Sequence, residues 1–382
     1  MRQRAEVIII GGGVIGCSIA YHLGRKGCRD VILLERESLG SGSTGRCAGG
    51  IRLQFSTEIN IHLSLLSVPA FENFAAEMGY EPEFRQVGYL ILATAPEEME
   101  AFRENVALQQ RLGVPVRLLT GTEAHGMVPQ LNVEDVLGAT FCARDGDADP
   151  YGVTQGYAHK ARELGVQIYE GTEARGIQVE KDRVKGVLTD KGTIEAQYVV
   201  NAAGPYAALV AAMAGVKIPV LPYRRFIFVT EPFPDLPDPL PMVIDFATGF
   251  YFHRESGGVL MGMGDRSEPS SFNLEVDWGF LPTLVERAIY RAPVLEKAQI
   301  KRGWAGLYEV TPDAHPILGR VPEVEGFILA NGFSGHGFMH APAVGLLIAE
   351  EVLDGKASTL DISPLMLDRF REGRAVPERS VI

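Results

Sequence analysis

Three glycines near the start of the chain have the spacing of a phosphate-binding turn. Gly11, Gly13 and Gly16 form a G-x-G-x-x-G pattern directly after the apolar run Val7–Ile10. In such a pattern the first glycine makes a tight turn, the second lets backbone approach a pyrophosphate, and the third lets helix and strand pack closely. Free N–H groups at the start of the next helix favour negative charge. The pattern therefore predicts a bound dinucleotide.

A carboxylate follows at the position where a ribose would lie. Glu35 comes directly after a second apolar run, residues 31–34, and its distance from Gly11 is close to the roughly 20 residues expected for an acid that binds a ribose diol. Such an acid would repel a phosphorylated ribose. The alternative is a solvated carboxylate at the end of a strand.

Composition limits the classes of protein that this chain can represent. With 382 residues it has room for two domains and a large cofactor, and its net charge of −12 argues against a nucleic-acid partner. The four cysteines show no C-x-x-C spacing and the histidines are scattered, so neither a disulfide framework nor a metal site is expected. No apolar run is long enough to span a membrane and no signal-peptide pattern opens the chain, which predicts a cytoplasmic protein.

The elements around the glycine turn follow from apolar periodicity. We expect a helix over 15–25, a strand over 31–34 and a helical pattern over 58–78, separated by the glycine- and serine-rich stretch 39–50. That stretch is either a flexible linker or a loop that wraps a cofactor with backbone donors. Further elements are strands at 84–93, 116–119, 166–169 and 198–200, helices at 96–112 and 157–164, and a hairpin over 176–190 that turns near 181–182.

A second strand, glycine loop and helix occur near the end of the chain. Residues 326–330 predict a buried strand, 331–339 a glycine-rich loop, and 341–353 a helix with Pro342 in its first turn. The free N–H groups of this helix would suit partial negative charge on a ligand. An ordinary helix cap is the alternative.

The middle of the chain has a different composition. Between residues 218 and 304 prolines cluster and β-type runs appear at 225–230, 249–253 and 258–262. We expect an antiparallel sheet with connecting helices, inserted before the nucleotide-binding part resumes.

Five ordered motifs together resemble the FAD-dependent amine and amino-acid oxidoreductases. That family includes D-amino acid oxidase, glycine oxidase, sarcosine oxidase, and the β subunits of heteromeric sarcosine oxidases and L-proline dehydrogenases; the β subunits are the most similar. The motifs, which cover almost the whole chain, are VIIIGGGVIG, LLERESLGSGSTGRCAGGIR, VVNAAGPYA, WAGLYEVTPDAHPILG and ANGFSGHGFMHAPAVG.

The resemblance implies an α/β fold of two domains, like that of D-amino acid oxidase. A Rossmann-type FAD-binding domain of the glutathione reductase type would comprise residues 1–80, 146–215 and 308–382. An inserted α+β substrate-binding domain with an antiparallel sheet would comprise residues 81–145 and 216–307.

The resemblance also implies non-covalent FAD and names residues that would bind it. These are Gly11, Gly13, Val14, Ile15, Gly16, Glu35, Arg36, Ser43, Thr44, Arg46, Gly49, Gly50, Ile51, Ala174, Ala203, Gly204, Gly335, His336, Gly337, Phe338 and Met339. Residues from 335 to 339 would face the isoalloxazine, where helix N–H groups stabilise the negative charge of the reduced ring.

Arg52, Tyr251 and His336 are expected to contribute to catalysis. Arg52 matches the position where sarcosine oxidases bind the substrate carboxylate, and a guanidinium suits a carboxylate because it can bind both oxygens. Tyr251 and His253 fall where the family presents polar side chains to the flavin, and His336 lies in the glycine loop. A surface ion pair is the alternative for Arg52, and a core aromatic residue is the alternative for Tyr251.

Four departures from the family pattern qualify the implied activity. Met339 stands where oxygen-reactive sarcosine oxidases carry a lysine, and Gly306 stands near the cysteine that tethers FAD in the monomeric enzymes. The histidine that holds a second flavin in the heteromeric enzymes is missing near Asp149. Arg225 replaces a histidine that lies near the substrate in proline dehydrogenase β subunits.

Together these features predict oxidation of the C–N bond of a small amino acid, such as proline, sarcosine or glycine, by hydride transfer to FAD. We expect a dehydrogenase whose electron acceptor is a quinone, a partner subunit or O2, in a homo- or hetero-oligomer. An oxidase that produces hydrogen peroxide is the alternative within enzymes. A flavoprotein that acts as an assembly or interaction factor is the alternative from another class.

Overall fold

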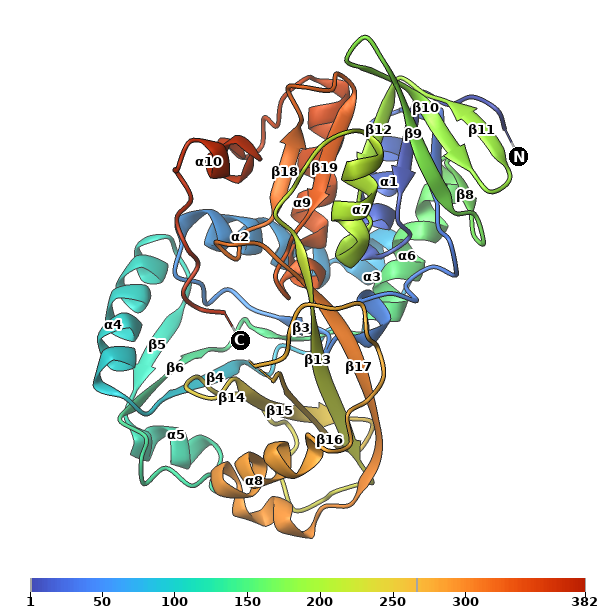
Figure 1. Cartoon of the computed structure of the whole chain (residues 1–382). Coiled ribbons are helices and arrows are strands. Elements are labelled where there is room, and N and C mark those ends of the chain that lie inside the picture. Colours follow the sequence, from blue (N-terminus) through green and yellow to red (C-terminus); the bar gives the residue numbers. More distant parts are fainter. Residues whose placement is uncertain (1, 266, 382) are drawn as a thin grey trace.

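Two large β-sheets organise the chain, as the computed structural model shows for residues 2–265 and 267–381. The six-stranded sheet has the order β18-β19-β12-β1-β2-β8, and the eight-stranded sheet has the order β17-β13-β16-β15-β14-β4-β6-β5. In Figure 1 the first sheet occupies the upper part and the second the lower part. The long strands β13 (Leu221–Thr230) and β17 (Ile300–Val310) belong to the second sheet and extend toward the first.

The six-stranded sheet is buried on both faces, which explains its continuous apolar runs. Val7 and Ile9 of β1 join the core formed with α1, α6 and α9, whereas Ile8 and Ile10 join a core on the opposite face. All neighbouring strands are parallel except β18 and β19.

The strands are β1 (Val7–Ile10), β2 (Val31–Leu34), β8 (Gln167–Tyr169), β12 (Tyr198–Asn201), β18 (Ile317–Arg320) and β19 (Phe327–Asn331). The helices on the first face are α1 (Val14–Arg25), α6 (Pro150–Glu163) and α9 (Gly337–Leu353). The opposite face is covered by α7 (Ala207–Met213) and by the antiparallel sheet of β9 (Ala174–Glu180), β10 (Arg183–Thr189) and β11 (Gly192–Glu195).

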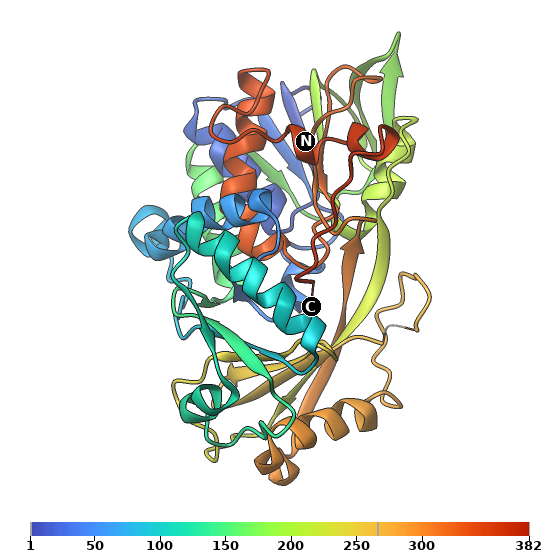
Figure 2. The same ribbon diagram turned by 90° about the vertical axis from the view of Figure 1, so that its left-hand side faces the viewer.

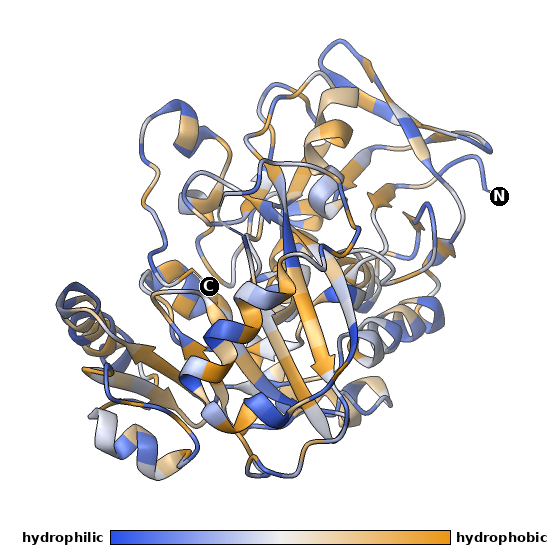
Figure 3. Ribbon diagram, turned by 60° about the horizontal axis from the view of Figure 1, so that its bottom comes forward, coloured by the Kyte–Doolittle hydropathy of each residue, from blue (hydrophilic) through white to orange (hydrophobic). Residues whose placement is uncertain are grey.

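The eight-stranded sheet is antiparallel except for the parallel pair β14 and β4, so the expected antiparallel layer is a mixed sheet. One face packs against α5 (Gly121–Met127) and α8 (Leu281–Arg291), through residues such as Phe226 and Leu284. In Figure 3, α8 alternates between polar and apolar residues, as expected for a helix that covers one face of a sheet. The remaining strands are β4 (Tyr89–Ala93), β5 (Val116–Leu119), β6 (Gly138–Cys142), β14 (Met242–Asp245), β15 (Phe250–Glu255) and β16 (Gly258–Met263).

The remaining elements lie outside the two large sheets and the helices already named. They are β3 (Gly50–Ile51), which pairs with β7 (Gly146–Asp147), the helices α2 (Glu58–Glu72), α3 (Phe74–Met78), α4 (Pro96–Arg111) and α10 (Asp368–Arg371), and four short 3₁₀ turns at Thr44–Arg46, Gly204–Tyr206, Pro293–Lys297 and Ser363–Leu365. After α10 the chain runs toward α4, where the Asn105 amide donates to the Ser380 hydroxyl at 3.4 Å, and Figure 2 shows this segment beside the helix.

Several predicted elements have different boundaries in the structure. The helical pattern 58–78 is interrupted at Asn73, and the last long helix begins at Gly337, so Pro342 lies inside α9 and not in its first turn. The helix predicted from residue 157 begins at Pro150, because Asp149 caps it by accepting from the N–H groups of two first-turn residues at 2.9 and 2.8 Å. The predicted strand 84–93 is paired only over Tyr89–Ala93.

The predicted domain boundaries stay a prediction. The strands of the six-stranded sheet come from the segments assigned to FAD binding, and those of the eight-stranded sheet mainly from the segments assigned to substrate binding. The strand β17 (Ile300–Val310) crosses the expected boundary after residue 307.

Candidate functional site

A cavity of about 440 Å³ joins the two sheets and collects most of the predicted site residues. Its walls come from segments that lie hundreds of residues apart in the sequence. The predicted residues that line it are Gly11, Gly13, Val14, Ile15, Glu35, Arg36, Ser43, Thr44, Arg46, Gly49, Gly50, Arg52, Ala174, Ala203, Gly204, Tyr251, Gly335, His336, Gly337, Phe338 and Met339. Gly16 and Ile51 do not line it.

The glycine turn has the close approaches that the motif predicts. Gly11 adopts a φ of 115°, and a Cβ at this position would lie 2.3 Å from the Ala202 carbonyl oxygen. A Cβ at Gly16 would lie 1.9 Å from the Gly11 carbonyl oxygen, so Gly16 acts by letting α1 pack against the end of β1. Helix α1 begins after Gly13, which has no side chain to cap it, and its first turn has no acidic residue. Its N-terminus can therefore accept a pyrophosphate.

Glu35 supports the glycine turn and also faces the cavity. One carboxylate oxygen accepts a hydrogen bond from the Gly12 N–H at 2.8 Å and the other from the Glu37 N–H at 2.8 Å. A carboxylate has about four lone-pair positions. Glu35 can thus hold the turn in place and still accept hydrogen bonds from ribose hydroxyls.

The glycine-rich stretch 39–50 is hydrogen-bonded to both sides of the cavity. The Ser43 hydroxyl donates to the Leu307 carbonyl at 2.7 Å, and the Thr44 hydroxyl accepts from the Val14 N–H at 3.1 Å. Arg46 donates to the Ala305 carbonyl at 3.1 Å. These contacts favour the interpretation as a cofactor-wrapping loop over that as a flexible linker.

One face of the eight-stranded sheet forms the substrate end of the cavity. Side chains alternate along each strand, and the pairing register places Tyr251, Arg225 and Tyr308 on the same face. Glycines opposite them leave room: a Cβ at Gly262 would lie 2.1 Å from the Tyr251 ring, and a Cβ at Gly264 would lie 2.5 Å from the Arg225 side chain. Burial raises the pKa of Tyr251 well above its usual value, so its hydroxyl keeps its proton.

Arg52 lies against the cavity wall and is almost fully buried, with 2% of its surface exposed. Its guanidinium donates to the carbonyls of Gln54 and Ser380, and it lies 4.1 Å from the centre of the Phe55 ring. It also contacts His336 Nε2 at 3.1 Å. An arginine has five N–H donors, so two remain beyond these three contacts.

His336 is neutral in this arrangement. Arginine can only donate, so the contact with Arg52 requires Nε2 of His336 to accept and places the ring proton on Nδ1. Burial, and secondarily the charge of Arg52, lower the pKa of His336 well below its usual value. The Nδ1–H group has no partner among the described residues.

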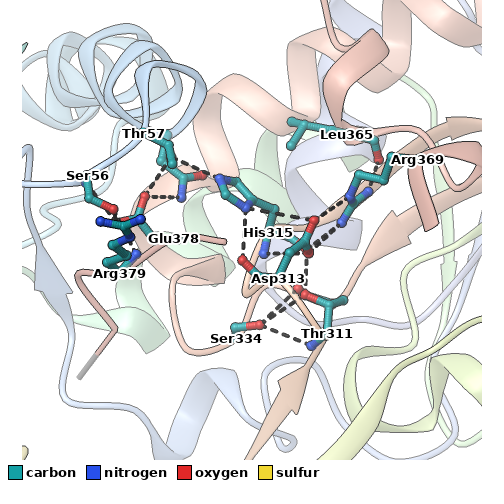
Figure 4. Close-up of polar contacts among 12 residues, drawn as sticks. Ser56, Thr57, Thr311, Asp313, His315, Ser334, Leu365, Arg369, Glu378 and Arg379 are labelled. Atoms are coloured by element: carbon teal, nitrogen blue, oxygen red, sulfur yellow. Dashed lines mark hydrogen bonds and ion pairs between the residues drawn. The ribbon is translucent and has the colours of Figure 1, made fainter. Parts of the chain in front are cut away.

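The C-terminal segment closes the site behind Arg52. Glu378 accepts hydrogen bonds from the Ser56 N–H at 2.7 Å, the Thr57 hydroxyl at 2.6 Å and the Asn60 amide at 3.0 Å. Figure 4 shows this cluster continuing through His315 to the buried Asp313–Arg369 ion pair. The segment thereby holds the Ser380 carbonyl against the Arg52 guanidinium.

Sequence reasoning missed several cavity residues and placed one residue wrongly. Tyr89, Tyr308 and Glu309 line the cavity, and the last two lie within a quoted motif without having been singled out. Burial raises the pKa of Glu309 to about 7, which makes it a cavity group that can change protonation near neutral pH. His253 does not line the cavity. It lies two residues after Tyr251 on the same face of β15, but it is buried.

A family model described as FAD dependent oxidoreductase, DAO, matches residues 6–351. The chain belongs to this family. FAD is therefore its cofactor, and the fold is the FAD-binding fold of this family. The glycine turn, the start of α1 without an acidic residue in its first turn, and Glu35 are the features of the cavity that fit the cofactor.

Similar proteins come from several sources. The chain is 33% identical to FAD-dependent oxidoreductase domain-containing protein 1 of Xenopus laevis, in an alignment that covers 100% of the chain and 85% of the relative. It is 32% identical to mitochondrial sarcosine dehydrogenase of Homo sapiens over 92% of the chain, but spans only 40% of that relative. Among solved structures, L-proline dehydrogenase from P.horikoshii is 37% identical, with a TM-score of 0.92 over 98% of this chain and 99% of that one.

Within the described residues, no helix is both long enough and apolar enough to cross a membrane.

Proposed function

We propose that this protein oxidises the C–N bond of a small amino acid by hydride transfer to FAD, and that it works as a dehydrogenase. The main support is that a single cavity has the glycine turn and Glu35 at one end and Arg52, Tyr251 and His336 at the other. The named activities of similar proteins, sarcosine dehydrogenase and L-proline dehydrogenase, support the substrate class.

Each side chain at the substrate end has a role in the proposal. FAD, when bound, supplies the hydride acceptor. Arg52 binds the substrate carboxylate and so fixes the direction of the amino acid. Tyr251 offers a neutral hydroxyl that orients the amine, and His336 accepts from Arg52 and so holds the guanidinium in place. The N-terminus of α9, at Gly337 to Met339, places N–H groups where they stabilise negative charge at the cofactor end.

The proposal is tested by anaerobic titration of the purified yellow protein with a panel of amino acids that includes proline, sarcosine and glycine. Loss of flavin absorbance with at least one of them is expected. A protein that keeps its FAD but is inert toward the whole panel would instead support an assembly or interaction factor. The cytoplasmic location, the natural electron acceptor and an oligomeric assembly stay predictions from the sequence.

We expect FAD to be bound without a covalent link. The candidate tether position is Gly306, which has no side chain, and it faces the backbone and Cβ of Arg46 within the cavity. Acid precipitation should therefore release all of the yellow colour into the supernatant. Flavin retained in the washed protein pellet would contradict the expectation.

Oxygen should be a poor electron acceptor, and Met339→Lys should raise the rate of air reoxidation by about tenfold or more. Electron transfer to oxygen builds negative charge in a low-dielectric pocket, where a nearby ammonium gives strong stabilisation. Met339 lines the cavity with a neutral thioether, and His336 is neutral as well. Arg225 is the alternative source of positive charge, because it lines the same cavity. Stopped-flow mixing of reduced enzyme with oxygenated buffer measures the rate.

Met339→Leu is the matched control, because it keeps the size of the side chain and adds no charge. Its reoxidation rate should equal that of the wild type. Fast reoxidation of the wild type, with stoichiometric hydrogen peroxide during turnover, would make the protein an oxidase.

A further inference from the structure

Arg225 carries a positive charge in the cavity, and the proposed oxidation of a simple amino acid gives it no role. It lines the substrate end, and its guanidinium carbon lies 5.0 Å from the centre of the Tyr308 ring. Among the described residues its only hydrogen bond goes to the carbonyl of its neighbour Arg224, at 2.8 Å, and none of their ion pairs includes it. Arg224, on the opposite face of β13, is paired with Glu268 at 2.5 Å.

The surroundings of Arg225 hold its side chain in the cavity. Its partner across β13 and β17 is Gly306, which adds no side chain beside it on this face. The side chain lies flat over Gly264, where a Cβ would be 2.7 Å from Arg225 Nε. The aromatic ring of Tyr308 covers it from one side. The guanidinium is therefore fixed but keeps unused donors.

A partly buried guanidinium with unused donors is a binding site for an anion. Desolvation of an unpaired charge is costly, and a carboxylate that forms a forked ion pair compensates for that cost. Arg52 already provides the site for the α-carboxylate. Two cations in one cavity thus match a substrate with two acidic groups.

We propose that the substrate is an amino acid that carries a second carboxylate, and that Arg225 binds this second group. The inference rests on the proposed function and makes it more specific. Arg225 is then the residue that separates dicarboxylic from monocarboxylic amino acids, because a substrate without the second carboxylate leaves its donors unpaired.

The test uses two pairs of ligands that differ by one carboxylate. Iminodiacetate is sarcosine with its methyl group replaced by carboxymethyl, and thiodiacetate is related in the same way to methylthioacetate. The two thioethers cannot be oxidised at a C–N bond, so their dissociation constants come from perturbation of the flavin spectrum and from calorimetry. The FAD-loaded wild type should bind thiodiacetate about ten- to a hundredfold more tightly than methylthioacetate. It should also favour iminodiacetate over sarcosine in kcat/KM.

Arg225→Met should abolish the preference in both pairs and leave the affinity for methylthioacetate unchanged. Arg302→Met is the matched control: it removes a cation from β17 that does not line the cavity, so the preference should persist. Equal binding of the two thioethers by the wild type would overturn the inference, as would a preference that survives Arg225→Met. A variant that loses affinity equally for both thioethers would also overturn it, because Arg225 would then bind the shared carboxylate. In these cases the proposed function stands if any amino acid reduces the flavin, and fails if none does.

Discussion

Replacing Arg52 with alanine should lower kcat/KM for the amino-acid substrate by about ten- to a hundredfold or more, with FAD content retained. Hydrogen bonds to charged groups contribute about 1.5–3 kcal/mol, and a lost carboxylate contact appears directly in kcat/KM. Arg52 lines the cavity and keeps two N–H donors beyond its contacts with Gln54, Ser380 and His336. Steady-state kinetics with a dye as acceptor measures the change.

The control for Arg52 is a change in the substrate. Arg52 also holds the Ser380 carbonyl, so its loss could act through the C-terminal segment. An amino amide lacks the carboxylate but keeps the reacting C–N bond. If Arg52 binds the carboxylate, Arg52→Ala should change kcat/KM for the amide only slightly. Equal losses for the acid and the amide would show that Arg52 has a positioning role instead.

The second large effect concerns stability: Asp313→Asn should lower the free energy of unfolding by about 3–5 kcal/mol. Arg369 and Asp313 form a buried pair at 2.7 Å, with 1% and 4% of their side chains exposed. Arg369 also donates to the carbonyls of Leu365 and His315. Without the carboxylate, a guanidinium stays buried and uncompensated. Equilibrium urea unfolding followed by circular dichroism measures the loss.

Asp368→Asn is the matched control. Asp368 lies in α10, the helix that also contains Arg369, and pairs with the exposed Arg371 at 3.0 Å. Exposed pairs contribute little, so this variant should lose less than about 1 kcal/mol. Equal losses of unfolding free energy in the two variants would show that the buried pair contributes no more to stability than the exposed pair.

The pH dependence of the Asp313 contribution follows from its pKa. Burial alone would raise the pKa of Asp313, but the hydrogen bonds and charge of Arg369 hold it below its usual value. A carboxyl with a lowered folded pKa binds fewer protons in the folded state than in the unfolded state. Its contribution is therefore complete above the unfolded pKa of about 3.9 and is lost as the pH falls through the folded pKa. The difference in unfolding free energy between the wild type and Asp313→Asn should therefore become smaller in that acid range.

The sequence alone determined the features that depend on local backbone geometry. The G-x-G-x-x-G turn and the strand and helix around it lie where the pattern placed them, because a tight turn and a close helix–strand contact tolerate only glycine at Gly11 and Gly16. The family followed from the order and spacing of five motifs. Short elements such as β14 and α5 escaped prediction because few residues give too weak a periodic signal, and tertiary packing selects their conformation.

Only the tertiary structure decided which polar residues meet at the substrate end. Tyr251 and His253 have the same strand parity, so alternation puts both on one face, but only Tyr251 lines the cavity and His253 is buried outside it. Arg52 meets His336 and Ser380 across 284 and 328 residues of sequence, a separation at which no local pattern carries information. The position of Arg225 over Gly264, unpaired and facing the same cavity as Arg52, likewise depends on the pairing of β13 with β16 and β17. Non-local strand register and burial determine these contacts, and they become visible only when the chain is folded.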